Sequence, residues 1–206
     1  MKNTKKALLA LTCAIMLVVA SVMGTMAYLT DTTETVTNTF TVGKVSITLD
    51  EAPVDADGKE TTGVRVIENE YHLLPGHDYD KDPTVHVAAN SENAWIFVKL
   101  ENGLKNIIDA TTVENQITGT KNGWTALAGV ENVYYKEYTK SATVVDMVVF
   151  EEFKIDGTKV VNVEDGEELP EGTVDIDEYD NAEITIIAYA MQADGMTDAA
   201  DAWSKF

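Results

Sequence analysis

The residues of this chain that are best suited to chemistry are three histidines, one cysteine and many carboxylates. His72 and His77 flank a Pro-Gly turn, and His86 lies in a segment that alternates polar and apolar residues. None of them has the HExxH or HxH spacing that is typical of paired metal-binding histidines. We therefore expect all three on the solvated surface, with His86 facing away from Val85 and Val87.

Neither a catalytic nucleophile nor a complete metal loop can be assembled from the sequence. There is no Gly-x-Ser-x-Gly elbow, and Cys13, the only cysteine, follows Thr12 in an N-terminal apolar run that does not fit a lipidation site. The stretch PVDADG begins like a calcium loop, but Pro53 and Val64 occupy the first and twelfth positions, where oxygen ligands are needed. The acidic turn DIDEYDN, residues 175–181, could supply oxygens to calcium or could be a solvated turn. We predict no catalytic residue, no cofactor and no resident metal, with loop calcium as the open alternative.

The N-terminus has the features of an export signal. Three lysines among the first six residues precede an apolar run over residues 7–23. The sequence Gly-Thr-Met-Ala ends in the small residue Ala27, so a signal peptidase is expected to cut between Ala27 and Tyr28. Left uncut, the uncharged run over residues 7–29 is long enough to anchor the chain in a membrane.

Cleavage at this bond divides the chain into a signal peptide, residues 1–27, and one secreted domain, residues 28–206. The full chain has 15 basic and 35 acidic residues, a formal net charge of −20. Loss of the three signal lysines leaves 12 basic against 35 acidic residues, a charge of −23. Such a surface repels nucleic acid and anionic lipid, so we expect no nucleic-acid partner, and membrane contact only through an uncleaved signal.

Alternation with a period of two dominates the part after the signal and predicts short strands. Val36, Asn38, Phe40 and Val42 share one face, and after Gly43 the alternation resumes over residues 45–49. Residues 85–100 are expected to form a hairpin around a polar turn at residues 90–93. Further strands are expected over residues 63–68, 132–138, 142–155, 158–163 and 182–192.

Only two segments have the pattern of a helix. They are residues 104–117 and the C-terminal tail, where Asp198 is a plausible cap and Ala202 and Trp203 could pack back on the body. Many short strands separated by turns indicate an all-β fold. We predict a jelly-roll-like antiparallel β-sandwich with one or two short helices, preceded by an N-terminal signal helix.

Four separated regions of the chain form a recognisable set. They are GTMAYLTDTTETVTNTFTVGKVSITL, LLPGHDYDKDPTVHV followed by NAWIFVKL, the pair GW and YYKEY, and the ending ITIIAYAMQADGMTDAADAW. Together they resemble the TasA/CalY/camelysin group of Gram-positive bacteria. The resemblance implies a jelly-roll-like sandwich, secreted through the dedicated signal peptidase SipW, that forms biofilm-matrix fibres. Camelysin members have also been described as metalloproteases, but this chain lacks a zinc-protease motif.

In TasA-like fibres the residues just after the cleavage site cross into the neighbouring subunit and complete its sheet. The resemblance places this donor segment at residues 28–40. Seven of the twelve residues from Thr30 to Thr41 are threonine, which favours extended backbone but buries little apolar surface, so the segment needs a sheet edge. Alternatively, it forms the first strand of its own domain. The donor residues are Tyr28, Leu29, Thr30, Asp31, Val36, Asn38 and Phe40.

The predicted function is that of a secreted, non-enzymatic structural protein of the extracellular matrix or cell surface. It is expected to assemble with itself or with related matrix subunits into fibres after a SipW-type peptidase has cut the signal. One alternative is a monomeric adhesion or glycan-binding module that presents Trp124, Tyr134, Tyr135 and Tyr138, although these aromatics also fit cross-strand packing. A second alternative is a camelysin-like secreted metalloprotease.

Overall fold

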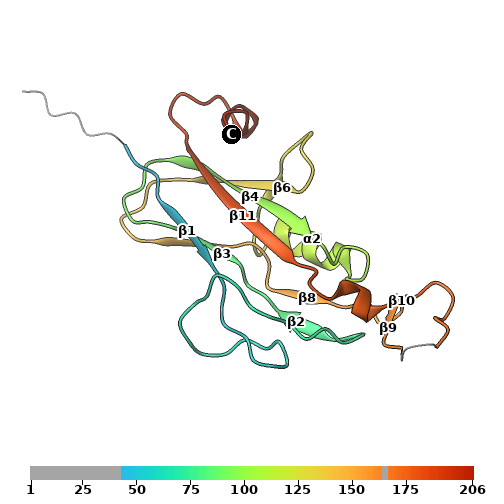
Figure 1. Ribbon diagram of the computed structural model, residues 1–206. Coiled ribbons are helices and arrows are strands. Elements are labelled where there is room, and N and C mark those ends of the chain that lie inside the picture. The colour runs from blue at the N-terminus through green and yellow to red at the C-terminus, as the bar shows by residue number, and fades with distance from the viewer. Residues whose placement is uncertain (1–42, 164–166) are drawn as a thin grey trace, which may run out of the picture. The chain divides into compact units, whose positions relative to one another are not determined.

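A computed structural model describes residues 43–163 and 167–206 of the chain (Figure 1). The predicted signal, the expected cleavage bond between Ala27 and Tyr28, and the predicted donor segment at residues 28–40 lie outside these residues.

Two antiparallel sheets make up most of the described fold, which confirms the predicted all-β class. The first has the order β1-β3-β7 and comprises β1 (Ile47–Asp50), β3 (Thr84–Val87) and β7 (Val145–Val148). The second has the order β11-β4-β6-β5 and comprises β11 (Ile184–Gln192), β4 (Ala94–Asn102), β6 (Val133–Tyr138) and β5 (Thr125–Ala126).

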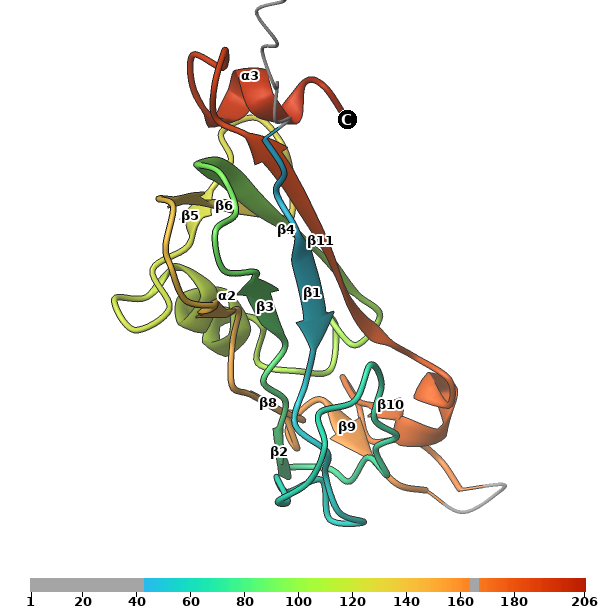
Figure 2. The same cartoon turned by 90° about the vertical axis from the view of Figure 1, so that its left-hand side faces the viewer.

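Two small strand pairs lie at one end of the two sheets, and the C-terminal helix lies at the other (Figure 2). Strands β2 (Asp78–Asp80) and β8 (Glu152–Lys154) pair antiparallel, whereas β9 (Val160–Val161) and β10 (Val174–Asp175) pair parallel. The helices are α2 (Ala110–Thr118), the short 3-10 helix η1 (Ile176–Tyr179) and α3 (Ala199–Trp203). Of the helix predicted over residues 104–117, the first part forms turns and only the second part is α2.

The two sheets share one apolar core and therefore pack face to face. Val85 and Val87 of β3 are fully buried on one side of this core. The second, four-stranded sheet, called the longer sheet below, supplies the other side of the core. Alternate side chains of each of its strands point toward the core, because successive residues of a strand face opposite sides of the sheet. The principal side chains of this shared core are Val85, Val87, Ile96, Val98, Leu100, Tyr134, Tyr138 and Met147.

The predicted hairpin over residues 85–100 is wrong. Strand β3 pairs with β1 and β7, whereas β4 pairs with β11 and β6, so residues 88–93 cross from one sheet to the other. The physical reason is that β4 is apolar on both faces. Ile96 and Val98 point into the shared core while Phe97 joins a second cluster, so β4 needs a central position in a sheet covered on both sides.

Two other strand predictions also need correction. Residues 63–68 are not a strand; they contribute only a single bridge between Glu51 and Val66, and they leave Val64 and Ile67 each 88% exposed. The long strand predicted over residues 142–155 is divided into β7 and β8. In contrast, β6 and β11 correspond closely to the predicted strands at 132–138 and 182–192.

The outer face of the longer sheet is covered by the C-terminal tail. As predicted, Asp198 caps α3, its carboxylate accepting a hydrogen bond from the backbone N–H of Asp201 at 2.8 Å. Ala202 is fully buried, and the Trp203 ring centroid lies 5.2 Å from those of both Phe97 and Tyr189. Around Phe97 and Tyr189 the longer sheet is thus covered on both faces, by the other sheet and by α3, whereas Lys99 and Glu101 of β4 stay partly exposed.

This arrangement predicts unequal roles for the two aromatic residues of the tail. Trp203→Ala should lower the free energy of unfolding by about 2 kcal/mol, because it removes an aromatic side chain that packs on two others. Phe206→Ala should cost less than about 1 kcal/mol, since Phe206 is 56% exposed. Urea unfolding, followed by far-ultraviolet circular dichroism of the backbone, measures both losses of unfolding free energy. Equal losses would contradict the assignment of Trp203 as the main contact of the tail.

Candidate functional site

Strand β11 is an apolar strand at the edge of the four-stranded sheet as the described residues form it. It runs for nine residues, ITIIAYAMQ, and pairs along its full length with β4. Within the described residues no strand pairs with its other side. Long apolar edges are unusual because they invite pairing with another chain. The open edge of β11 is therefore the most conspicuous candidate for an interaction site.

The register shows which backbone groups the open edge presents. The N–H of Gly103 donates to the carbonyl of Glu183, and the N–H of Ala193 donates to that of Asn93, both at 2.8 Å. In an antiparallel pair the bonded residues alternate, so positions 185, 187, 189 and 191 also face β4. The N–H and C=O groups of the intervening residues point away from the sheet. These residues are Ile184, Ile186, Ala188, Ala190 and Gln192.

The first sheet has β1 at its edge, and no strand of the described residues pairs with the outer side of β1. Strands β1 and β11 lie side by side (Figure 2). The N–H of Ala88 donates to the carbonyl of Ser46 at 2.9 Å, so Thr48 and Asp50 also face β3, and Ile47 and Leu49 turn their backbone groups outward. The sandwich is thus open along the line where β1 meets β11.

A groove of about 790 Å³ opens at one end of this line. It lies between the end of β1 with residues 67–73 on one side and residues 181–186, at the start of β11, on the other. A groove of this size can hold an extended peptide or a small ligand, and its lining is mixed, with somewhat more polar than apolar surface. The large aliphatic side chains and the phenylalanine that line it are Leu49, Ile67, Leu73, Leu104, Phe153, Ile176, Ile184 and Ile186.

The polar residues of the groove are predominantly acidic. Five carboxylates among them take part in none of the ion pairs found in the described part of the chain. The lysine of the groove, Lys81, is occupied by Glu51, with 2.6 Å between Nζ and Oε2. An entering segment that carries acidic residues will be repelled at low ionic strength. The five carboxylates belong to Glu68, Glu70, Asp177, Asp180 and Glu183.

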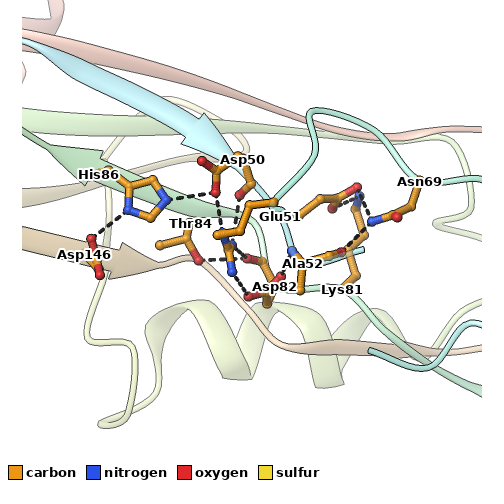
Figure 3. A network of polar contacts seen from close by, with 10 residues as sticks. Asp50, Glu51, Ala52, Asn69, Lys81, Asp82, Thr84, His86 and Asp146 are labelled. Atoms are coloured by element: carbon orange, nitrogen blue, oxygen red, sulfur yellow. Dashed lines mark hydrogen bonds and ion pairs between the residues drawn. The ribbon is translucent and has the colours of Figure 1, made fainter. Parts of the chain in front are cut away.

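One wall of the groove is held by the guanidinium of Arg65. Its Nε donates to a carboxylate oxygen of Asp50, and its Nη1 donates to the carboxylate of Asp82 at 2.7 Å. Its Nη2 reaches the backbone carbonyls of the same two residues, at 3.2 and 3.0 Å. The Asp82 carboxylate also accepts from the N–H of Ala52 at 2.6 Å (Figure 3). Arg65 therefore ties its own loop to the end of β1 and to the residues before β3.

A second group of contacts satisfies the buried carboxylate of Glu51, which is 4% exposed. Besides Lys81, it accepts a hydrogen bond at 3.0 Å from the side-chain amide of Asn69. The same amide nitrogen donates to the carbonyl of Ala52 at 2.8 Å (Figure 3). The side-chain oxygen of Asn69 accepts a hydrogen bond from the N–H of Val54. A buried charge needs such partners, so Glu51 holds Lys81 and Asn69 in fixed positions along the wall.

His86 is not the solvated surface histidine that the sequence suggested. Its side chain is 20% exposed and lies between two carboxylates, with Nδ1 2.6 Å from Asp146 of β7 and Nε2 2.8 Å from Asp50 of β1 (Figure 3). Ionised carboxylates only accept hydrogen bonds, so this arrangement favours the imidazolium form, in which both ring nitrogens donate. Burial alone would lower the pKa of His86, but the hydrogen bonds to Asp146 and Asp50 outweigh it and raise the pKa. The expected orientation away from Val85 and Val87 is confirmed.

The other histidines and the acidic turns have simpler surroundings. His72 and His77 are exposed, as predicted. The carboxylate of Asp55 accepts hydrogen bonds from the backbone of its own turn, and that of Asp175 caps η1. Across residues 43–163 and 167–206 no group of three or more His, Cys, Asp or Glu side chains is arranged to hold a metal ion.

The aromatic residues considered for glycan binding are mostly in the core. Trp124, Tyr134 and Tyr138 are 2%, 6% and 2% exposed, and the Trp124 indole donates to the carbonyl of Val148 at 2.7 Å. Tyr135 is half-buried beside Trp95. Cross-strand packing is therefore the correct interpretation of this group. In the described part of the chain, no helix has the length and apolar character needed to cross a membrane.

Comparison with protein-family models, with curated proteins and with solved structures produced no match to this chain. The resemblance to the TasA/CalY/camelysin group therefore rests on the sequence segments quoted above. The site rests on its own geometry: an open strand edge, an adjoining groove and a rigid polar wall.

The imidazolium of His86 predicts a specific dependence of stability on pH. Because folding raises its pKa above the ordinary 6.5, its contribution is complete below that pH and is lost as the pH rises through the raised value. Asp50 has a lowered pKa: burial opposes this shift, but Arg65 and His86 outweigh it, so its contribution is lost only in acid, below its ordinary 3.8.

His86→Asn should therefore cost about 1 kcal/mol of unfolding free energy at about pH 5.5 and close to nothing at about pH 9. His77→Asn is the matched control, because His77 is exposed, and should have no effect at either pH. Chemical denaturation at both pH values measures the difference. A loss from His86→Asn that stays constant with pH would show that His86 acts through shape and not through its charge.

Proposed function

We propose that this protein is a secreted, non-enzymatic structural subunit of the cell surface or extracellular matrix of a Gram-positive bacterium. Subunits assemble when the N-terminal segment of one copy, residues 28–40, adds as a strand to the open edge of β11 in the next. The observation that carries this proposal is the nine-residue apolar strand β11, one edge of which pairs with no strand among residues 43–163 and 167–206. Main-chain hydrogen bonds supply affinity in such strand addition, and alternate side chains supply specificity.

The composition of the N-terminal segment suits this role. Val36 and Phe40 lie on the same face of the expected strand, and threonines occupy most of the opposite face. That apolar face complements the apolar lining of the groove at Ile184 and Ile186. The threonines, which bury little on their own, remain outside. The segment thus gains a fixed conformation only when a sheet edge is offered to it.

The positions of the two ends favour an open-ended, head-to-tail assembly. Gly43 lies beside the C-terminal end of β11, because a Cβ atom built on it would be 2.9 Å from the side chain of Glu92 and 3.6 Å from that of Gln192. The groove lies at the other end, near Ile184. The strand between them spans about 30 Å. An N-terminal segment that leaves at one end and an acceptor groove at the other give a heterologous contact, which repeats from subunit to subunit and builds a filament when the rotation between neighbours does not close a ring.

Signal cleavage would act as the assembly switch. While residues 1–27 are attached, the donor segment is held at the membrane. A cut between Ala27 and Tyr28 by a SipW-type peptidase releases it. The other candidate functions, a monomeric glycan-binding module and a camelysin-like metalloprotease, have no specific observation in their favour among the described residues.

Charge sets the conditions under which assembly occurs. The cleaved chain carries a formal charge of −23, the donor segment contains Asp31 and Glu34, and the groove has unpaired carboxylates. Neighbouring subunits therefore repel one another until the charges are screened or neutralised. Purified chain that begins at Tyr28 should form filaments, and light scattering should rise with salt, lowered pH or divalent cations. Scattering that stays flat under all three conditions would count against assembly.

A proline can test the open edge without breaking the sheet. The N–H of Ala188 faces the open side, so Ala188→Pro removes no bond to β4 but blocks an incoming strand. We expect this variant to keep its circular dichroism spectrum and to form no filaments in electron micrographs. Ala188→Ser, which keeps the N–H, is the control and should assemble. Deletion of residues 28–40 should also abolish filaments, and filaments from either blocked variant would refute the proposal.

A further inference from the structure

The loop over residues 61–70 displays two large apolar side chains although its backbone is firmly anchored. Val64 and Ile67 are each 88% exposed. Between them, Val66 exchanges two backbone hydrogen bonds of 2.8 Å with Glu51, and the Arg65 guanidinium binds Asp50 and Asp82. An exposed apolar side chain on a loose loop needs no explanation, but this loop is held on both sides of the exposed residues.

The anchoring of the loop is polar and owes nothing to its exposed apolar side chains. The side-chain amide of Asn69 donates to Glu51 and to the carbonyl of Ala52 at 3.0 and 2.8 Å (Figure 3). It also accepts from the N–H of Val54 at 3.1 Å, which closes the loop. The loop therefore has this conformation without a partner. Binding of a partner to the loop costs little conformational entropy, because the loop is already ordered.

The two exposed side chains differ in where they lie. Ile67 lines the groove, together with Glu68, Asn69 and Glu70, whereas Val64 does not. Ile67 therefore belongs to the groove that also includes the start of β11, and Val64 does not. The same loop provides two apolar residues of equal exposure, one at the groove and one away from it.

We propose that loop 61–70 is a preformed grip for the strand that enters the groove, and that Ile67 is the side chain that closes over it. The occupant is the N-terminal segment of a second copy, so this inference rests on the function proposed above. Fifteen residues, 28–42, precede Gly43 in the cleaved chain and span about 50 Å when extended. That length is sufficient to leave one subunit beside Gln192 and reach along the groove of the next.

The sequence of the segment fits this contact. Val36, Phe40 and Val42 share one face and alternate with threonine and asparagine. A strand that turns this face toward the groove places an apolar side chain under Ile67 and removes both from water. Asp31 and Glu34 lie in the first part of the segment, and their repulsion by the acidic groove makes the apolar contact the main local attraction.

The pair Ile67→Asn and Val64→Asn tests the grip in the chain that begins at Tyr28. Both changes replace an equally exposed apolar side chain, so both variants should unfold at the wild-type temperature within about 2 °C. The measured quantity is the concentration of soluble protein that remains after filaments are sedimented in a fixed salt buffer. Ile67→Asn should raise it about tenfold and Val64→Asn less than about twofold.

The outcomes separate this inference from the one on which it rests. Wild-type protein that forms no filaments would overturn both. Filaments from the wild type, with Ile67→Asn unchanged or with Val64→Asn as damaging as Ile67→Asn, would overturn the grip and leave strand addition standing. Loss of assembly in Ile67→Asn alone, with its melting temperature preserved, is the result that the grip requires.

Discussion

The constraint on which this structure depends is the edge strand β11, whose apolar side chains and outward backbone groups meet no partner strand within residues 43–163 and 167–206. Its neighbour β4 is apolar on both faces in its first half, where a second sheet covers one face and α3 packs on the other. Both covers act on faces and neither protects an edge. Strand β11 is therefore left at the edge of the sheet. It pairs with β4 on one side, and on the other side five of its residues turn their backbone groups outward.

The polar wall beside this edge shows how a strongly acidic chain can fold tightly. Asp50 lies between Arg65 and His86, Asp82 faces Arg65, and Glu51 is neutralised by Lys81. Arg65 and His86 each bind two carboxylates on different segments, so charge pairing also joins β1, β3, β7 and the loop before β2. Part of the excess negative charge lies in the groove and in the N-terminal segment. The few cations thus stabilise the fold of one subunit, while the many acids in excess of them make neighbouring subunits repel one another.

Local patterns predicted the elements but not their partners. The alternation of residues 132–138 and 182–192 and the cap at Asp198 were sufficient to place β6, β11 and α3, because these depend on period and on one side chain. The hairpin at residues 85–100 was wrong because sheet membership depends on distant strands. The position of His86 could not be predicted for the same reason, since Asp50 and Asp146 approach it only through the register of three strands. The exposed loop at 63–68 resembles a strand because its valines alternate, yet polar contacts hold it out of the sheets.

The central claim is that the open edge of β11 is completed by another copy of the chain and not by its own N-terminal segment. Amide hydrogen exchange at single-residue resolution, on cleaved protein at high dilution and again in filaments, tests it most directly. The account predicts that the amides of Ile184, Ile186, Ala188 and Ala190 exchange fast in the dilute protein and become protected in filaments, while Thr185, Ile187 and Tyr189 are protected in both. Protection of the first group in the dilute monomer would contradict it, because the edge would then be closed within one chain.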